Sequence, residues 1–286
     1  MTIREIYDAY LSSLKEIYSS GEAAAITDII FRHFANLTRS EIITKGNVLP
    51  DEATAAHLRD ALERLKQHIP VQYITGEAWF HNLKFLVNEH VLIPRPETEE
   101  LVQAAINFLK IHTGKKVLEI GTGSGCIAIS IKKNIPDAQI ISVDVSTDAI
   151  KTAKANAVLN NVSVEFREIN FLKKEDYNTL GNFDLIISNP PYIPAYEKKG
   201  LDKNVALYEP AIALFVPDKD PLIFYRYILS FANDHMSVGG VIFLEIHENL
   251  SKETQALFSG ENYSAEIKRD IFGKERMLVC SKKIEG

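Results

Sequence analysis

Cysteine is scarce in this sequence. The 286 residues include only two, Cys126 and Cys280, and neither lies in a cluster of other metal-ligating residues. Disulfide frameworks and structural zinc sites need several such residues at short spacings. The sequence therefore predicts no metal site and no disulfide scaffold, and it favours the reducing cytoplasm as the location.

Long apolar runs are missing as well. A membrane-spanning helix needs about 18 or more consecutive apolar residues, and the sequence has no run of that length. The opening residues MTIREIYDAY are charged and amphipathic, unlike the apolar core of a signal peptide. Hydrophobic residues still make up 46% of the chain, enough for a buried core. We expect a folded protein without membrane contact and, because no coiled-coil pattern is present, a monomer.

Positive charge is not in excess. The 38 acidic and 32 Lys or Arg side chains give a net charge of -6. Residues 1–94 hold 12 acidic and 9 basic side chains, and residues 95–286 hold 26 and 23, so each part carries -3. Proteins that bind a phosphate backbone through charge are usually basic. This balance argues against a direct nucleic-acid partner.

The first 75 residues have helical periodicity. Apolar residues recur at three- and four-residue spacing over 3–18, and further helices are expected near 23–37 and 51–68. Thr38-Arg39-Ser40-Glu41 fits a capping box, which predicts a short helix that Gly46 ends. We expect a small helical bundle here. Gly76 then breaks the helical pattern, and residues 84–93 alternate and are rich in strand formers, which predicts a β-hairpin linker over 76–94.

Beyond residue 95, strand and helix patterns alternate. A turn at Gly239-Gly240 is expected to precede the fifth strand. The expected strands are residues 117–120, 140–143, 162–167, 184–188, 241–246, 265–269 and 277–280. Such alternation predicts an α/β fold, a mostly parallel sheet with helices on both faces.

A glycine-rich segment, Glu119 to Gly125 (EIGTGSG), lies where the first of these strands meets the first helix. Glycines let the chain turn sharply and let a ligand approach the main chain. Asp144 ends the second strand, where a carboxylate can bind both ribose hydroxyls of a nucleoside. A dinucleotide fingerprint would have Gly in place of Cys126, and a P-loop would end in Lys-Ser/Thr. The pattern favours a nucleoside without a pyrophosphate, which S-adenosylmethionine fits; an NAD site and a turn kept for packing stay open.

The segment Ser188-Asn189-Pro190-Pro191-Tyr192 follows the fourth strand, at the sheet edge where α/β folds bind ligands. Two prolines make the turn rigid, because each fixes its own φ and restricts the residue before it. The turn presents two acceptors, the Asn189 side-chain oxygen and the Pro190 carbonyl. Tyr192 adds an aromatic face that could pack on a planar substrate.

Two fixed acceptors suit an NH2 group with two hydrogens. An amide or aromatic NH2 is a poor nucleophile because its lone pair is delocalised. Acceptors that hold both N–H bonds orient the nitrogen and stabilise the positive charge that develops on it. Together with the nucleoside loop, the turn predicts methyl transfer from a sulfonium to nitrogen, with a purely structural Pro-Pro turn as the alternative.

The EIGTGSG loop, Asp144 and the NPPY turn together resemble class I S-adenosylmethionine-dependent methyltransferases that act on planar NH2 groups. Three further segments narrow the resemblance to the HemK/PrmC family: QYITGEAWF at 72–80, IPRPETE at 93–99, and Tyr208-Glu209-Pro210. The match covers nearly the whole chain. It implies a Rossmann-like, seven-stranded, mostly parallel sheet and three parts: a helical substrate-docking domain (1–75), the β-hairpin linker (76–94) and a catalytic domain (95–286).

The resemblance also implies an activity. Enzymes of this family use S-adenosylmethionine to methylate the side-chain amide nitrogen of the glutamine in the Gly-Gly-Gln motif of peptide chain release factors. By the same resemblance, the cofactor-binding residues are Gly121, Thr122, Gly123, Ser124, Gly125, Asp144, Asn170, Phe171 and Asn189. Asn189, Pro190, Pro191 and Tyr192 would bind the glutamine, and Asn189, Pro190 and Tyr192 would serve catalysis. Asn170 stands where the family commonly has Asp, and the Arg common shortly before Tyr208 is absent here.

Two other functions stay open. A DNA or RNA amino-methylase would have a basic cleft and usually a target-recognition domain, which the charge and length disfavour. A non-catalytic nucleoside-binding protein would not need Asn189, both prolines and Asp144 together. Arg95 and Glu209 could form an ion pair at the cleft, or both could be solvated.

Overall fold

The computed structural model describes residues 1–177, 179–260 and 262–283 of the chain. It contains two compact units, residues 1–76 with 202–208, and residues 77–201 with 209–286. Each unit has its own hydrophobic core. None of the helices in the described residues is long and apolar enough to cross a membrane.

The smaller unit is helical, as predicted. It comprises α1 (Ile3–Leu14), α2 (Ser20–Ala35), α3 (Arg39–Lys45), α4 (Glu52–Lys66), α5 (Val71–Thr75) and α9 (Lys203–Tyr208). The capping box at Thr38 is confirmed, because its hydroxyl accepts from the Glu41 amide and the Glu41 carboxylate accepts from the Thr38 amide. Apolar stripes of α1, α2 and α4 meet in the core, where the Tyr10 hydroxyl donates to the Leu58 carbonyl.

Two elements of this unit were not predicted. Helix α5 follows Pro70 directly and has a single turn or so, too short for a periodic pattern. Helix α9 lies about 130 residues further along the chain, and the Tyr208 hydroxyl donates to the Gln67 carbonyl at 2.7 Å. A segment distant in sequence thus belongs to the helical unit.

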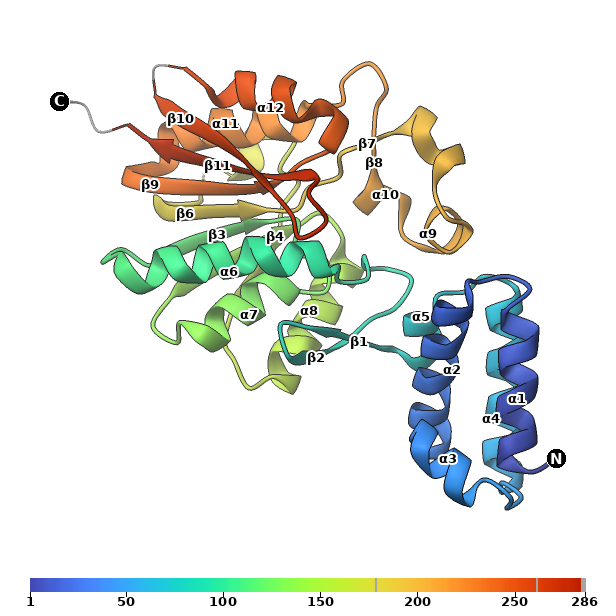
Figure 1. Cartoon of the computed structure of the whole chain (residues 1–286). Helices are drawn as coiled ribbons and strands as arrows, with labels where there is room; N and C mark the ends of the chain where they lie inside the picture. Colours follow the sequence, from blue (N-terminus) through green and yellow to red (C-terminus); the bar gives the residue numbers. More distant parts are fainter. Residues whose placement is uncertain (178, 261, 284–286) are drawn as a thin grey trace. The chain divides into compact units, whose positions relative to one another are not determined.

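The larger unit contains a seven-stranded sheet in the order β10-β11-β9-β6-β3-β4-β5, drawn in Figure 1. Its strands are β3 (Lys116–Ile120), β4 (Gln139–Asp144), β5 (Glu165–Glu168), β6 (Phe183–Ser188), β9 (Met236–Glu245), β10 (Tyr263–Arg269) and β11 (Glu275–Lys282). Strands β9, β6, β3, β4 and β5 run parallel, while β11 and β10 pair antiparallel at one edge. The prediction of a mostly parallel, seven-stranded sheet is confirmed.

Helices cover both faces of the sheet (Figure 1). On one face lie α6 (Pro96–Ile111), α7 (Cys126–Asn134) and α8 (Thr147–Leu159); on the other lie α11 (Ile223–His235) and α12 (Ser251–Phe258). Successive strand residues alternate between the two cores: Val117 packs in the first and Leu118 in the second. Continuous apolar strands are therefore buried on both sides, as is typical of parallel sheets.

The hairpin of β1 (Glu77–Phe80) and β2 (Leu83–Leu86) belongs to the larger unit. Its strand β2 is shorter than the alternating pattern through residue 93 suggested. Phe80 and Phe85 are buried in the core under α6 and α7. The Asn156 amide of α8 fixes the hairpin further, because it accepts from the Leu86 amide at 2.6 Å and donates to the Leu86 carbonyl at 2.9 Å.

The prediction of a turn at Gly239-Gly240 is wrong. Both glycines lie inside β9, which begins at Met236. Gly239 has φ +74°, and the register between β6 and β9 shifts at this level. The two glycines accommodate an irregularity within the strand. Glycine is common at such irregularities as well as in turns.

Short elements fill the long segment after β6. They are β7 (Ile193–Pro194), η2 (Ala195–Gly200), α10 (Ala211–Leu214) and β8 (Phe215–Val216), with β7 and β8 paired in parallel. The remaining 3₁₀ turns are η1 (Lys174–Tyr177) and η3 (Glu248–Leu250).

Candidate active site

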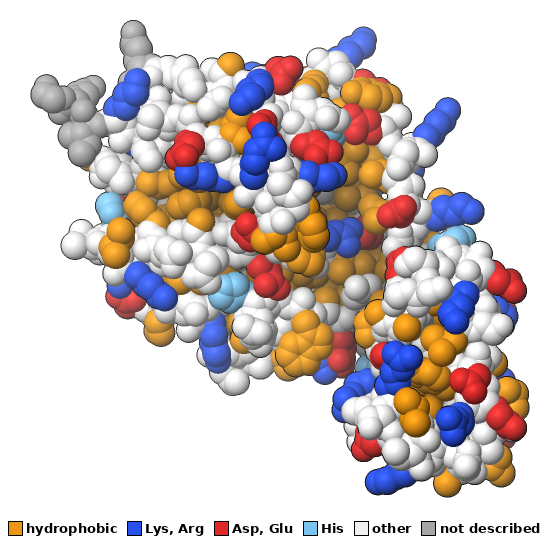
Figure 2. Space-filling view, viewed as in Figure 1, with side chains coloured by type: hydrophobic (Ala, Val, Ile, Leu, Met, Phe, Trp, Pro, Cys, Tyr) orange, Lys and Arg blue, Asp and Glu red, His pale blue; other side chains and the backbone are white. Residues whose placement is uncertain are grey.

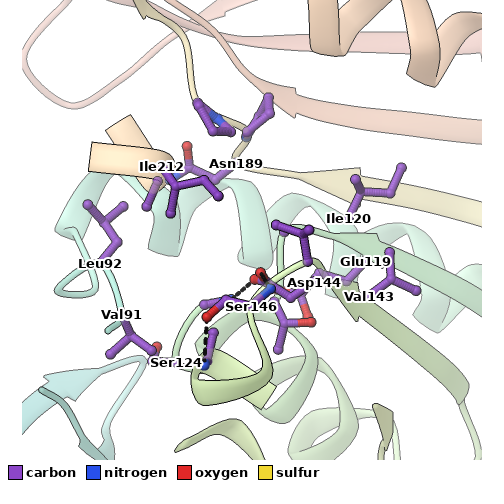
Figure 3. A pocket seen from close by; sticks show the side chains of 18 of the residues that line it. Val91, Leu92, Glu119, Ile120, Ser124, Val143, Asp144, Ser146, Asn189 and Ile212 are labelled. Carbon is purple, nitrogen blue, oxygen red and sulfur yellow. Dashed lines mark hydrogen bonds between the residues drawn. The ribbon is translucent and has the colours of Figure 1, made fainter. Parts of the chain in front are cut away.

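A cavity of about 260 Å³ opens at the carboxyl ends of the parallel strands. The sheet order places β3 between β6 and β4, so the segments that follow these three strands meet at this edge. The register pairs Ile120 with both Val143 and Ser188, which puts the glycine loop beside the strand that leads into Asn189. Figure 3 shows Asn189 and Ile212 on one side of the cavity and Glu119, Ser124 and Asp144 on the other.

Main-chain hydrogen bonds and backbone dihedral angles define the conformation of the glycine loop. The amides of Gly121 and Thr122 both donate to the Val143 carbonyl, at 2.8 and 3.1 Å, and the Gly125 amide donates to the Thr122 carbonyl at 2.8 Å. Gly121, Gly123 and Gly125 have φ of +84°, +51° and +80°. Only glycine adopts this left-handed region without strain, so the sequence of the loop follows from its conformation.

Asp144 closes the loop from the end of β4. Its carboxylate accepts from the Gly123 amide and from the Ser146 amide, both at 2.9 Å. Burial raises the pKa of Asp144, while the hydrogen bonds from Gly123 and Ser146 act in the opposite direction. The predicted ribose acceptor thus also holds the glycine loop.

A buried acid lies beneath the loop. Burial raises the pKa of Glu119 to about 8, and the nearby Asp144 adds to this effect, although the Ser142 hydroxyl donates to Glu119 at 2.6 Å. Ser142 in turn contacts the Thr122 hydroxyl at 2.6 Å. Within the described part of the chain, Glu119 Oε1 and Ser124 Oγ have no hydrogen-bond partner, and both residues line the cavity. These atoms could bind a ligand that carries donors.

The Asn-Pro-Pro turn forms the opposite wall. The Ser188 hydroxyl donates to the Ile120 carbonyl at 2.6 Å, which ties the start of the turn to the end of β3. Asn189, Pro190 and Pro191 all line the cavity. A Cβ on Gly121 would lie 3.7 Å from the Asn189 carbonyl oxygen, so loop and turn approach each other closely.

Side chains from three elements hold Asn189. Its Nδ2 donates to the hydroxyl of Thr98, in the first turn of α6, at 3.2 Å. The Thr98 hydroxyl donates to Oε2 of Glu245, at the end of β9, at 2.6 Å. The Tyr192 hydroxyl donates to Oε1 of the same carboxylate at 3.0 Å.

Tyr192 is not among the described residues that line the cavity, and its predicted roles in catalysis and glutamine binding stay predictions. Its ring packs beside the core under α11, and its hydroxyl meets Glu245 rather than lining the cavity. Burial raises the pKa of Tyr192 above its usual range, and the neighbouring Glu245 adds to the shift. An aromatic ring next to Pro-Pro was visible in the sequence, but its direction depends on the distant carboxylate.

The other predicted cofactor residues line the cavity. Asn170 and Phe171 follow β5, and Asn170 Oδ1 accepts from the Leu172 amide at 3.0 Å. The question of Arg95 and Glu209 is also answered: Arg95 lines the cavity and pairs with Glu209, which is buried and also accepts from the Ile93 amide at 3.2 Å.

Sequence reasoning missed the supporting residues Thr98, Asn156 and Ser142. The Asn156 amide donates to the Ser124 carbonyl at 2.9 Å and also to Leu86 of the hairpin, so it links the glycine loop to the hairpin. Glu245, which supports Thr98, ends β9 at the same edge of the sheet. A buried polar residue that ends a strand at this edge was the available signal, although its partners could not be read from the sequence.

Comparison with known proteins agrees with this geometry. Residues 100–207 match the family described as methyltransferase small domain, and residues 5–76 match the PrmC N-terminal domain. The chain is 44% identical over 282 residues to the release factor glutamine methyltransferase of Flavobacterium psychrophilum, covering 97% of this chain and 98% of that protein. It is 35% identical over 276 residues to the one of Bacteroides thetaiotaomicron, covering 96% and 98%.

A solved structure shares the fold. It is described as a putative SAM-dependent methyltransferase from Streptococcus mutans; the TM-score is 0.51 at 13% identity, over 72% of this chain and 55% of that one. The two full-length relatives and the two matched domains show the family. The chain belongs to the release factor glutamine methyltransferase (HemK/PrmC) family.

Proposed function

We propose that this protein transfers a methyl group from S-adenosylmethionine to the side-chain amide nitrogen of the glutamine in the Gly-Gly-Gln motif of peptide chain release factors. Family membership and the likeness to full-length relatives support the substrate class. The single observation that carries the chemistry is the placement of Asn189 across one cavity from the glycine loop and Asp144 (Figure 3).

The cavity residues fit the cofactor. S-adenosylmethionine supplies an electrophilic methyl group on a sulfonium, and it also carries an ammonium group and ribose hydroxyls. The carboxylate of Asp144 suits its positive charge and its donors, and Glu119 Oε1 and Ser124 Oγ offer unpaired polar atoms in the lining. The three glycines let a ligand approach the loop backbone closely. Phe171 adds an apolar surface that suits the adenine ring.

The turn would orient the substrate amide. The Nδ2 of Asn189 is engaged by Thr98, so its Oδ1 is the atom left to accept from a glutamine NH2. The Pro190 carbonyl, beyond the end of β6, would accept the second N–H. Two acceptors fix the direction of the nitrogen lone pair and stabilise positive charge on it as the new bond forms. A general base before transfer is not needed, because the methylated amide nitrogen is strongly acidic and loses its proton readily.

Tyr192 supports the turn in this proposal. Its hydroxyl donates to Glu245, and its ring packs against the core, so it holds the turn from behind. Pro191 would contact the glutamine from the cavity wall. We infer that the helical unit, residues 1–75 of the predicted division, docks the release factor, since its match to the PrmC N-terminal domain sets it apart from the methyltransferase region.

A nucleic-acid substrate is disfavoured by charge. The chain carries a net charge of -6, and the face in Figure 2 intersperses Lys and Arg with Asp and Glu. Electrostatic capture of a phosphate backbone needs a concentration of positive charge. We propose a monomer that acts on a protein substrate without direct nucleic-acid contact.

Mass spectrometry tests the proposal. A release factor is incubated with the wild-type protein and S-adenosylmethionine, and its tryptic peptides are analysed. We expect one added methyl group on the Gly-Gly-Gln glutamine, and its loss with Asn189→Ala. An unmodified release factor, under conditions in which calorimetry shows cofactor binding, would reject the substrate while leaving the cofactor site in place.

A further inference from the structure

We propose that Thr98 and Glu245 are positioning residues that determine which edge of the Asn189 amide faces the substrate. The inference rests on the proposed function, because it concerns the acceptor that holds the glutamine NH2. It assigns a role to a buried chain of hydrogen bonds that joins α6, β9 and the turn after β6.

The number of protons available to these hydrogen bonds fixes the direction of each one. A threonine hydroxyl has a single proton, and at Thr98 that proton is donated to Glu245 Oε2 at 2.6 Å. Thr98 Oγ1 therefore meets Asn189 only as an acceptor. Asn189 must present its NH2 to Thr98, at 3.2 Å, and its carbonyl oxygen to the other side.

The reversed amide is disfavoured twice. With the amide flipped, Asn189 Oδ1 would face Thr98 Oγ1, and two acceptors would meet without a proton between them. On the substrate side, the Asn189 NH2 would face the glutamine NH2, so donors would meet donors. A buried mismatch of this kind costs about 1–3 kcal/mol, enough to select one orientation.

Glu245 determines the direction in which the Thr98 hydroxyl donates its proton. Glu245 is only 3% exposed. Both of its carboxylate oxygens accept from hydroxyls, Oε2 from Thr98 and Oε1 from Tyr192. Burial raises the pKa of Glu245; the hydrogen bonds from Thr98 and Tyr192 and the charge of Arg276 oppose this, and Glu97 reinforces it. The Tyr225 hydroxyl donates to the Glu245 backbone carbonyl at 3.0 Å. Both oxygens are thus occupied as acceptors, and when the carboxylate is ionised it accepts only, so both hydroxyl protons point at it.

The position of Thr98 is itself fixed. It lies in the first turn of α6, after Pro96, and its amide donates to the Arg95 carbonyl at 3.1 Å. The residue is 2% exposed yet contributes to the cavity lining, so it separates the buried carboxylate from the cavity. Its hydroxyl is engaged by Asn189 and Glu245, so we assign it a positioning role that acts through Asn189.

Three single variants test the chain. Thr98→Val is close in shape to threonine but has no hydroxyl, Thr98→Ser retains the hydroxyl, and Glu245→Gln supplies both a donor and an acceptor. We expect Thr98→Val and Glu245→Gln to lower kcat on a release factor by about 10- to 100-fold, as misorientation of a reacting group does. Thr98→Ser should stay within about 3-fold of the wild type, and calorimetric cofactor affinity should change little in all three.

A double-mutant cycle separates positioning from general destabilisation. If Thr98 acts through Asn189, then Thr98→Val should lower kcat in the wild type but have almost no effect in the Asn189→Ala background. Equal effects in both backgrounds, or a wild-type kcat for Thr98→Val, would overturn the proposal. A Thr98→Ser variant as slow as Thr98→Val would overturn it too. Absence of methyl transfer by the wild type would instead reject the proposed function, and the positioning role with it.

Discussion

The two walls of the cavity are built in different ways. On the glycine-loop side, main-chain atoms bond directly to one another, as between Gly121 and Val143 or Gly125 and Thr122. On the Asn189 side, the reacting side chain is held by other side chains, through Thr98 to Glu245. One wall depends on backbone conformation and the other on a buried polar network.

The difference tells which substitutions each wall tolerates. A wall that main-chain hydrogen bonds hold should keep its structure after most side-chain substitutions. An added Cβ at a glycine with positive φ should instead destabilise it. A side-chain network is sensitive to the loss of a single hydroxyl, because each member satisfies the next. We therefore expect variants of the loop to impair folding or cofactor binding, and variants of the turn to impair methyl transfer.

Asn189→Ala should have the largest effect and separates the two walls most clearly. It removes an oriented acceptor from the reacting NH2, so kcat/KM should fall about 10²- to 10³-fold. Steady-state kinetics on a release factor measures this loss. Cofactor affinity should change only a few-fold in calorimetry, and a variant that turns over like the wild type would remove Asn189 from the mechanism.

Gly125→Ala probes the main-chain wall. Gly125 has φ +80°, and an added Cβ would lie 3.0 Å from both the Ala153 Cβ and the Ile129 Cδ1. Left-handed strain and crowding together should lower the free energy of unfolding by about 2–3 kcal/mol, measured by urea denaturation. Gly21→Ala is the control, since Gly21 lies in α2 with open space around it. Its stability should stay equal or rise, and equal losses in both variants would contradict the comparison.

Asp144→Asn tests the side chain on which the main-chain wall depends. The amide would place an NH2 against one of the two backbone donors, Gly123 or Ser146, that the carboxylate now accepts from. We expect the cofactor Kd to rise about 10-fold, as charge-assisted hydrogen bonds are lost. Asp148→Asn is the matched control, because Asp148 is exposed and pairs with Lys151 on the surface of α8. A similar Kd for the two variants would show that the loop does not need its carboxylate.

Glu119→Gln should have the smallest effect, visible as a change in pH dependence. Folded Glu119 keeps its proton up to about pH 8, whereas its ordinary pKa is 4.5. Between these values the native state binds more protons than the unfolded state, so its contribution makes stability fall as pH rises. The glutamine variant should lose this fall in the free energy of unfolding, which is at most roughly 1.4 kcal/mol per pH unit. Urea denaturation at pH 5.5, 6.5 and 7.5 measures it; parallel curves for both proteins would contradict the assignment.

Much of the cavity could be predicted from the sequence, because parallel strands bring their carboxyl ends to one edge. The glycine loop, Asp144, Asn170 and the Asn-Pro-Pro turn each follow a recognisable strand. Each of them contributes to the cavity lining, although Gly125 of the loop does not. Their individual roles in binding and catalysis stay predictions. What could not be predicted is the network behind Asn189, since Thr98 lies 91 residues away from it and Glu245 lies 147 residues from Thr98.

The same limit applies to the fold. Segments with a local signal were predicted close to their observed bounds, as with the short helix that Thr38 caps and Gly46 ends. Gly239-Gly240 was misread because glycine marks both turns and strand irregularities. Residues 202–208 join the helical unit through tertiary contacts, which leave no local periodic pattern.

The pairing of Ile120 with Ser188 has a consequence for how this protein could diversify. The loop and the turn begin at neighbouring strand ends, about 4.8 Å apart, and the cavity residues all belong to the larger unit. The spacing between the loop and the turn is thus set by a hydrogen-bonded ladder within the larger unit. Surfaces that select the protein substrate are free to change during evolution while the reacting groups keep their spacing.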